Sequence, residues 1–578
     1  MGSVSLLGVL LALILYAVSV SPSLLPRRWW WHAFVSGILM ALGYVVGVAI
    51  QDLFGYLSSV TGITVEGPQG VIDGGKWLVV TAVAIWTLQA VIRSYLDSRR
   101  AALLVNMKPV KLPEYLVGVL ASCGVFALVM APVQLAIMIF DQVVRLLSGW
   151  IPWIIAVTLS ALVVAGIFVL VTNRVILKGI VTYFVHSARG LNDRSNDHVP
   201  VPQVPERSGS PFSKASWASI GGQGRLFLGH GPDAAKIQQV TGRPAMEPVR
   251  AYVGLPTENA DLHEQAAKAV AELKRAGGLK RSVVVVNTAT GSGWVDEWLC
   301  QPLEYLTGGD CAIVSMQYSY LFSAVMMISD LEPCALAGRV LFEAVEDAIY
   351  ELPAHERPAL MVAGESLGAF GSQAAFRDED DLLSRVDGAI WAGTPNGSKL
   401  FQDLRKQRHP GSPEVAPVVN NGRHIRFVNE PQQLECDLYG RELGPWSFPR
   451  VVFAQHASDA VVWFQARLTF EEPDWLRERA GKDVSPSMRY TPIATCLQVI
   501  ADLPVAGLAP AGHGHTYHRE LIDVWIKVLG LDGNDMVGNV PAGQWIDEDM
   551  KIAIGDAIKA DHDPVRDHAQ PEGADGTI

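Results

Sequence analysis

The stretch ALMVAGESLGAFGSQAAF, residues 359–376, decides the fold of the second part of the chain. The apolar run from Ala359 to Ala363 is typical of a buried strand, and the small residues after Gly368 suit a helix. Between them lies the pattern G-x-S-x-G around Ser366, and its glycines remove the Cβ clashes of a sharp strand-to-helix turn. This context predicts a nucleophilic serine above a sheet; the alternative is a serine that only caps the helix.

Strand-like and helix-like segments alternate on both sides of this stretch. Amphipathic helical patterns occur at residues 263–278 and 336–353. The candidate strands are residues 282–288, 311–318, 359–364, 386–393 and 450–455. This alternation predicts a doubly wound α/β domain, whose mostly parallel sheet is covered by helices on both faces.

A serine nucleophile needs a histidine base and an acid that orients the base, expected in the chain order Ser, Asp, His. Asp459 lies just past the candidate strand at 450–455 and is the expected acid, although an aspartate there could also bond only its own turn. The loop AGHGHTYH, residues 511–518, precedes an apolar helical segment. Within it His515 is the preferred base, and His513 is the alternative.

The oxyanion of an acyl-transfer reaction would need backbone amide donors near Ser366. The amide of Leu367, at the start of the expected helix, is one candidate. The second donor should come from the loop ATGSGW, residues 289–294, where Thr290 and Gly291 are the candidates. This glycine-rich loop lacks the G-K-[ST] ending of a phosphate-binding P-loop.

Composition and spacing argue against several other kinds of protein. The formal net charge of −12 and the absence of a basic stripe disfavour nucleic acid as a partner. The histidines at 513–518 could form a metal cluster, but no carboxylates or cysteines accompany them at ligand spacing. We therefore expect neither a metal nor a cofactor.

The first part of the chain is strongly apolar. Five apolar runs, each close to the ~20 residues that a membrane-spanning helix needs, occupy residues 4–20, 33–50, 77–92, 115–140 and 151–171. Most Lys and Arg flank alternate ends of these runs, which predicts an external N-terminus and a cytoplasmic catalytic domain. A re-entrant segment at Pro132 would reverse that orientation. The lipid bilayer is thus an expected partner.

These patterns divide the chain into four parts. Residues 1–186 are the expected multi-span transmembrane domain, and residues 187–216, rich in Ser and Pro, are the expected linker. Residues 217–536 form the expected catalytic domain. Residues 537–578 are acidic and rich in Gly and Pro, so we expect a flexible tail.

Several stretches together resemble one family. They are NTATGSGWVDEW, EYLTGGDCAIVSMQYSYL, RPALMVAGESLGAFGSQAAF, DGAIWAGTPNGS and AGHGHTYHRELIDVW, at residues 287–298, 304–321, 357–376, 387–398 and 511–525. They resemble bacterial membrane-bound α/β-hydrolases that carry a multi-span N-terminal domain. The family pattern has a proline where Ala289 stands. The resemblance implies an α/β-hydrolase domain with a serine nucleophile and supplies no substrate.

Two functions fit these features. A Ser366–Asp459–His515 triad beside a membrane predicts an esterase-like or lipase-like hydrolase, or an acyltransferase with the same acyl-enzyme, acting on a lipid or lipid-linked ester. The alternative is a non-enzymatic scaffold or transport-associated protein. The apolar runs contain almost no charge, which disfavours transport. The order of the three residues favours the enzyme.

Overall fold

The computed structural model describes residues 5–561 except 63–67, 171–198, 258–259, 322, 324–325, 328–329, 479–480, 534–535, 538–539 and 541–544. The chain forms two compact units. Met1–Thr182 and Val484–Ala501 make up the first, the helical unit. Tyr183–Asp483 and Asp502–Ile578 make up the second, the sheet unit.

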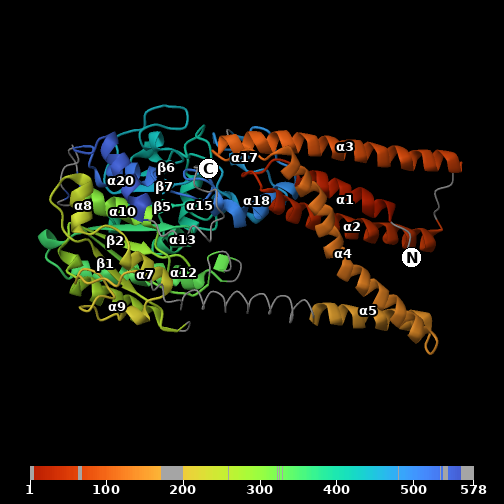
Figure 1. Cartoon of the computed structure of the whole chain (residues 1–578), viewed down its shortest axis with the longest axis horizontal. Helices are drawn as coiled ribbons and strands as arrows, with labels where there is room; N and C mark the ends of the chain where they lie inside the picture. The colour runs from red at the N-terminus through yellow and green to blue at the C-terminus, as the bar shows by residue number, and fades with distance from the viewer. Residues whose placement is uncertain are drawn as a thin grey trace. The chain divides into compact units, whose positions relative to one another are not determined.

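The helical unit contains a helix at each of the five expected apolar runs. These are α1 (Leu6–Ser19), α2 (Trp29–Thr61), α3 (Gln69–Leu104), α4 (Leu112–Ser148) and α5 (Trp153–Leu170), all labelled in Figure 1. Among the described residues, α2, α3 and α4 are long and apolar enough to cross a membrane, whereas α1 and the described part of α5 are shorter. At 1.5 Å per residue, the 14 residues of α1 fall short of a ~30 Å hydrocarbon core.

Large apolar side chains point outward from the helical unit. Those more than two-thirds exposed include Trp77, Leu78, Leu120, Leu128 and Ile154. Polar contacts between helices include the 2.8 Å hydrogen bond from Ser19 Oγ on α1 to Ser36 Oγ on α2. An outward-facing apolar surface on long helices is compatible with a membrane protein.

A segment from late in the chain belongs to the helical unit. Residues Val484–Ala501, which include most of α18 (Ala494–Asp502), lie between the expected acid and the expected base in sequence. The buried Gln498 donates its amide hydrogens to the carbonyl oxygens of Val18 and Ser21, both at 2.9 Å. The expected catalytic domain, residues 217–536, is therefore not one continuous unit.

The sheet unit is built on seven parallel strands. They are β1 (Val249–Val253), β2 (Val283–Thr288), β3 (Cys311–Met316), β4 (Ala359–Glu365), β5 (Gly388–Ala392), β6 (Ile425–Val428) and β7 (Arg450–Ala454). Their order is β1-β3-β2-β4-β5-β7-β6, and each neighbouring pair is parallel. The predicted doubly wound α/β-hydrolase fold is confirmed; β1 and β6 were not among the candidate strands.

Helices cover both faces of this sheet. On one face α9 (Leu262–Arg275), α12 (Glu332–Tyr350) and α13 (Leu367–Gln373) pack together. On the other lie α8 (Ala234–Thr241), α10 (Glu297–Leu306), α19 (Glu520–Leu529) and α20 (Glu548–Asp561). Figure 1 shows α9 below β1 and α8 and α10 above β2. The remaining α-helices of this unit are α7 (Gly222–Gly229), α14 (Glu379–Arg385), α15 (Lys399–Lys406), α16 (Ala460–Trp463) and α17 (Asp474–Arg477).

The strand order indicates where in the sheet a ligand site is expected. The chain moves from β2 to β3 toward one edge of the sheet, and from β4 to β5 toward the other edge. The direction therefore reverses between β2 and β4, which are neighbours with Thr288 opposite Gly364. In open α/β sheets, the crevice outside the carboxyl ends of two such strands is where ligands bind.

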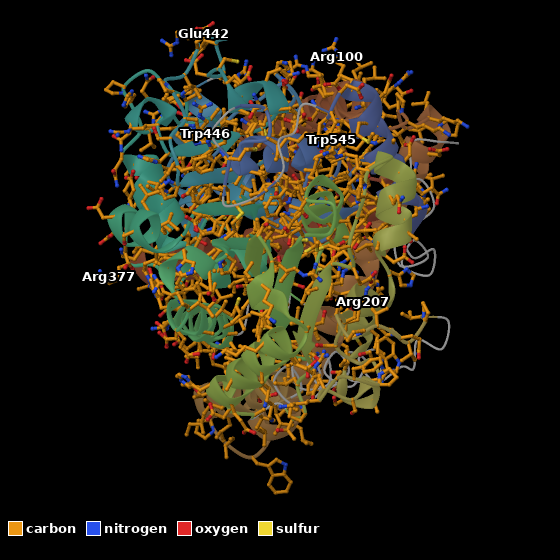
Figure 2. The ribbon with its side chains drawn as sticks, turned by 90° about the vertical axis from the view of Figure 1, so that its left-hand side faces the viewer. Arg100, Arg207, Arg377, Glu442, Trp446 and Trp545 are labelled. Carbon is orange, nitrogen blue, oxygen red and sulfur yellow. The ribbon has the colours of Figure 1, made fainter. Side chains whose placement is uncertain are left out.

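Two expected boundaries are wrong because apolar and charged side chains find partners in the sheet unit. Part of the expected linker, residues 199–216, packs against β1: the buried Arg207, labelled in Figure 2, pairs with Glu247 at 3.0 Å and donates to the carbonyl of Pro232 at 2.7 Å. Part of the expected flexible tail forms α20, whose Ile554 and Ile558 are fully buried. Residues 187–198 and 562–578 lie outside the described part of the chain.

Candidate active site

Ser366 occupies a strained turn at the carboxyl end of β4. β4 ends at Glu365, α13 begins at Leu367, and Ser366 between them has φ 55° and ψ −123°. A positive φ at a non-glycine residue is unfavourable and persists only where the surroundings enforce it. The amide of Ser366 donates to the carbonyl oxygen of Ala392 at 3.0 Å, which ties the turn to the end of β5.

The flanking glycines leave no room for a side chain. A Cβ on Gly364 would lie 2.5 Å from the carbonyl carbon of Gly368. A Cβ on Gly368 would lie 2.2 Å from the carbonyl oxygen of Thr288. Both distances are far below van der Waals contact. Close packing of α13 against the ends of β4 and β2 thus requires both glycines of the G-x-S-x-G pattern.

Asp459 and His515 are joined directly. His515 Nδ1 lies 2.7 Å from Asp459 Oδ2, and the carboxylate is fully buried. The other oxygen, Oδ1, accepts a 2.9 Å hydrogen bond from the amide of Val461, so Asp459 also caps α16. A carboxylate can only accept here, which assigns the hydrogen to Nδ1 and leaves Nε2 as the basic nitrogen of the neutral ring.

The ring of His515 lies against the strand end that holds Ser366. A Cβ on Gly393 would lie 2.4 Å from His515 Cε1, so only glycine lets the ring sit this close to the backbone. Gly393 directly follows Ala392, whose carbonyl accepts the amide of Ser366. His515 Nε2 is buried and has no hydrogen-bond partner among the described residues. Contacts between a base and its nucleophile often tighten only when substrate binds.

His513, the alternative base, has a different partner. Its Nδ1 lies 3.5 Å from Asp483 Oδ2. Burial alone would raise the pKa of Asp483, but hydrogen bonds from His513 and Ser458 outweigh burial and hold that pKa below its ordinary value. The structure thus brings His515, and not His513, to Asp459.

Tyr517 is a residue of the site that the sequence did not reveal. Its hydroxyl donates to Asp459 Oδ2 at 2.8 Å and accepts the amide hydrogen of His456 at 3.1 Å. Burial, with Asp459 beside it, raises the pKa of Tyr517 well above its usual range. The phenol therefore stays a donor to the carboxylate. Its position two residues after His515 was the available signal.

Hydrogen bonds within the loop after β2 show that one expected oxyanion donor, the amide of Thr290, is wrong. The amide of Thr290 donates to the carbonyl oxygen of Trp294 at 2.9 Å, and the amide of Gly293 donates to Thr290 at 2.8 Å. The loop closes on itself as a turn, so the Thr290 amide is already used. Gly291 has no such bond to a described residue. The amide of Leu367, in the first turn of α13, has no partner within that helix.

Comparison with protein families gives a match along most of the chain. Residues 249–537 match the model described as "Alpha/beta-hydrolase family", and residues 20–232 match the model of that family's N-terminus. The chain belongs to this α/β-hydrolase family. Membership confirms the resemblance to an α/β-hydrolase family with a distinct N-terminal region, and it agrees with the seven-stranded parallel sheet. No curated protein and no solved structure matches the chain.

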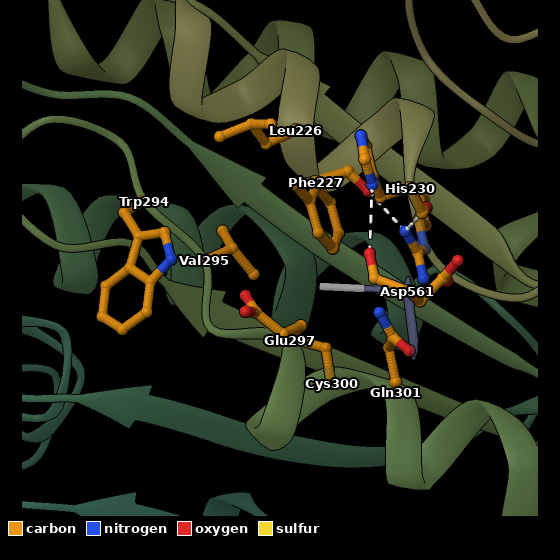
Figure 3. Close-up of a pocket in the computed structure, with 10 residues that line it drawn as sticks. Leu226, Phe227, His230, Trp294, Val295, Glu297, Cys300, Gln301 and Asp561 are labelled. Atoms are coloured by element: carbon orange, nitrogen blue, oxygen red, sulfur yellow. Dashed lines mark hydrogen bonds between the residues drawn. The ribbon is translucent and has the colours of Figure 1, made fainter. Parts of the chain in front are cut away.

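A small pocket lies elsewhere in the sheet unit. Ser366, Asp459 and His515 do not line it. It encloses about 30 Å³. Figure 3 shows Trp294 and Val295 on one side of it and His230, Gln301 and Asp561 on the other. That volume suits one or two water molecules. Among the described residues, no group of three His, Cys, Asp or Glu side chains is placed to hold a metal ion.

Proposed function

We propose that the chain is a membrane-anchored serine hydrolase, esterase-like or lipase-like, or an acyltransferase that uses the same acyl-enzyme. The observation that carries the proposal is the hydrogen bond between Asp459 and His515, with the His515 ring packed over Gly393 beside the turn of Ser366. The chain order Ser, Asp, His is that of α/β-hydrolases, and the nucleophile lies at the switch point of the sheet.

In the first half of the reaction, Ser366 Oγ attacks the carbonyl carbon of an ester while its proton passes to His515 Nε2. Asp459 holds Nδ1–H and stabilises the imidazolium. The amides of Leu367 and Gly291 donate to the oxyanion of the tetrahedral intermediate. The intermediate collapses, the C–O bond of the leaving alcohol breaks, and this alcohol takes the proton from His515. The product is an acyl ester on Ser366.

In the second half, an acceptor attacks the acyl ester. His515 Nε2 removes the proton of the acceptor, and Ser366 regains a proton when its ester bond breaks. With water as acceptor the chain is a hydrolase; with an alcohol it is an acyltransferase. The residues at the site serve both reactions equally.

The substrate we propose is a lipid or lipid-linked ester. The support is the helical unit, whose long helices present exposed apolar side chains such as Trp77 and Leu128. An enzyme held at a bilayer meets amphiphilic molecules at high local concentration. Comparing the lipids of a Ser366→Ala strain with those of wild type tests this: the substrate should accumulate in the variant strain. Unchanged lipids in a strain whose wild-type enzyme is active would contradict a lipid substrate.

Covalent labelling tests the proposed activity. A fluorophosphonate probe should label the purified full-length chain at Ser366, and Ser366→Ala should abolish labelling. Ser384 is exposed on α14, so Ser384→Ala is the matched control and should label like wild type. A wild-type chain that does not label, or a Ser366→Ala chain that labels equally, would refute the enzyme and favour a scaffold.

We also propose that the helical unit spans the membrane and that the sheet unit faces the cytoplasm, from the distribution of Lys and Arg. Glu442, labelled in Figure 2, is an exposed position of the sheet unit for a reporter thiol. An impermeant maleimide should react with Glu442→Cys in inside-out vesicles and not in intact cells, relative to the parent chain. Reaction in intact cells would reverse the orientation.

A further inference from the structure

The residue before the proposed base is held by both of its backbone groups. The amide of Gly514 donates to Ser458 Oγ at 2.8 Å. The carbonyl oxygen of Gly514 lies 2.9 Å from His456 Nδ1. His456 and Ser458 belong to the same short loop after β7 that supplies Asp459. The loop that orients the acid therefore also clamps the backbone next to His515.

His456 carries a hydrogen on each ring nitrogen. Its ring is buried, Nδ1 faces the carbonyl of Gly514, and Nε2 lies 3.1 Å from Glu520 Oε1. A backbone carbonyl only accepts hydrogen bonds, and so does an ionised carboxylate. Both nitrogens must then donate, which makes the ring an imidazolium paired with Glu520.

The electrostatic surroundings agree with this assignment. Burial alone would lower the pKa of His456, but the hydrogen bond and charge of Glu520, with Asp483, raise it above its ordinary value. Burial alone would raise the pKa of Glu520, but His456 lowers it. Both shifts favour the charged forms of the pair.

Ser458, the second residue that holds Gly514, is itself bonded to a carboxylate. Ser458 Oγ accepts from Gly514 and donates to Asp483 Oδ2, which also faces His513. The other titratable groups around His456 are Tyr517, stacked on its ring with centroids 4.2 Å apart, and Asp459 and His515, joined to Tyr517 by a hydrogen bond and a ring contact. None of these competes for the two hydrogens of His456.

We infer that His456, as an imidazolium between Glu520 and the carbonyl of Gly514, is a positioning residue that sets the orientation of His515, and that loss of its proton weakens catalysis at high pH. The inference rests on the proposed function. Deprotonation removes one of the two donors, so either Gly514 or Glu520 loses its partner and the base loop is released. Misplacement of a reacting group by about 1 Å can cost 10²-fold in rate.

The proposed activity depends on the protonation of two histidines. His515 accepts a proton only as the neutral imidazole. His456 must be charged to hold Gly514, so activity falls as pH rises through the raised pKa of His456. The result is an alkaline limb in the pH profile. Tyr517 does not supply the alkaline limb, since its pKa lies well above the usual range.

The test is the rate of fluorophosphonate labelling of the full-length chain between about pH 5 and 10, where histidines titrate. His456→Gln should slow labelling about 10- to 100-fold and abolish the alkaline limb. His355→Gln makes the same change at an exposed histidine and should match wild type. An alkaline limb that survives in His456→Gln, or a wild-type rate, would overturn the inference.

Two further variants keep the test decisive if His456→Gln does not fold. Glu520→Gln retains the shape but removes the charge that stabilises the imidazolium, so its alkaline limb should move to lower pH. Ser458→Ala should slow labelling and leave the alkaline limb where it is. A limb unmoved by Glu520→Gln would overturn the inference. A wild-type chain that never labels would instead refute the proposed function.

Discussion

The carboxylate of Asp459 and the imidazole of His515 meet over 2.7 Å although 56 positions separate them in the chain. Between them the chain leaves the sheet unit for Val484–Ala501 and then returns. The fold of the sheet unit therefore brings the two residues together, although the chain between them includes a segment of the helical unit. The carboxylate fixes which nitrogen of His515 is basic.

Replacing Asp459, the proposed acid, should remove most of the proposed activity without unfolding the chain. Asp459→Asn preserves the size of the side chain, but its amide can donate to Nδ1 and so stabilise the wrong tautomer of His515. We expect the labelling rate of Ser366 to fall by about 10³- to 10⁴-fold, as for other Ser-His-Asp triads. Asp403 is a partly exposed carboxylate on α15 that pairs with Lys399, and Asp403→Asn should label normally. An active Asp459→Asn chain would exclude Asp459 as the acid.

Removing the phenol hydroxyl should weaken the same carboxylate. Tyr517→Phe deletes a 2.8 Å hydrogen bond to Asp459 and leaves the buried amide of His456 without its acceptor. We expect a loss of about 1–3 kcal/mol in the free energy of unfolding and a labelling rate several-fold lower. Urea unfolding and probe labelling measure the two effects. Tyr439 is half exposed, and Tyr439→Phe is the control expected to change neither.

A methyl group on Gly368 should disrupt the nucleophile turn. Its Cβ would meet the backbone carbonyl of Thr288 at 2.2 Å, and a backbone atom in a sheet has little freedom to move. We expect Gly368→Ala to destabilise the chain by about 1–3 kcal/mol and to lower labelling at Ser366. No atom lies within 4 Å of a Cβ on Gly397, so Gly397→Ala should keep wild-type stability and labelling. Equal melting temperatures for the two variants would contradict this geometry.

Asp483 should make the stability of the chain sensitive to acid. Its pKa is lower in the folded chain than in the unfolded chain, so its contribution is present at neutral pH and is lost as pH falls below about 4. Asp483→Asn should lower the free energy of unfolding by about 1–3 kcal/mol near pH 7. The difference from wild type should shrink at acid pH in thermal unfolding scans. A difference that does not depend on pH would show that the charge of Asp483 is not involved.

The strand-to-helix turn at Ser366 was predictable because its determinants are local. A buried strand, a serine between two glycines and a small-residue helix are contiguous in residues 359–376, and each has its own sequence pattern. The same holds for the five apolar runs, since helix length and apolarity are read over a single segment. Strands β1 and β6 were missed because an arginine interrupts the apolar run of each, Arg250 in β1 and Arg426 in β6.

The partner of Asp459 could not be decided from local patterns. His513 and His515 share one glycine-rich loop, and only the folded chain shows that His515 contacts Asp459 whereas His513 faces Asp483. The Thr290 amide was a reasonable oxyanion donor from its position. The loop's own turn hydrogen bond to Trp294 uses that amide, and such a bond has no sequence pattern.

The sequence by itself determined that a doubly wound sheet follows a set of apolar helices, and that Ser366 stands on a strand-to-helix turn, because these features depend on neighbours in the chain. Only the tertiary structure decided that His515 pairs with Asp459, that Tyr517 joins them, and that Val484–Ala501 belongs to the helical unit. These depend on hydrogen bonds and packing between residues far apart in sequence. Burial selects those contacts when the whole chain folds, and a linear pattern does not record them.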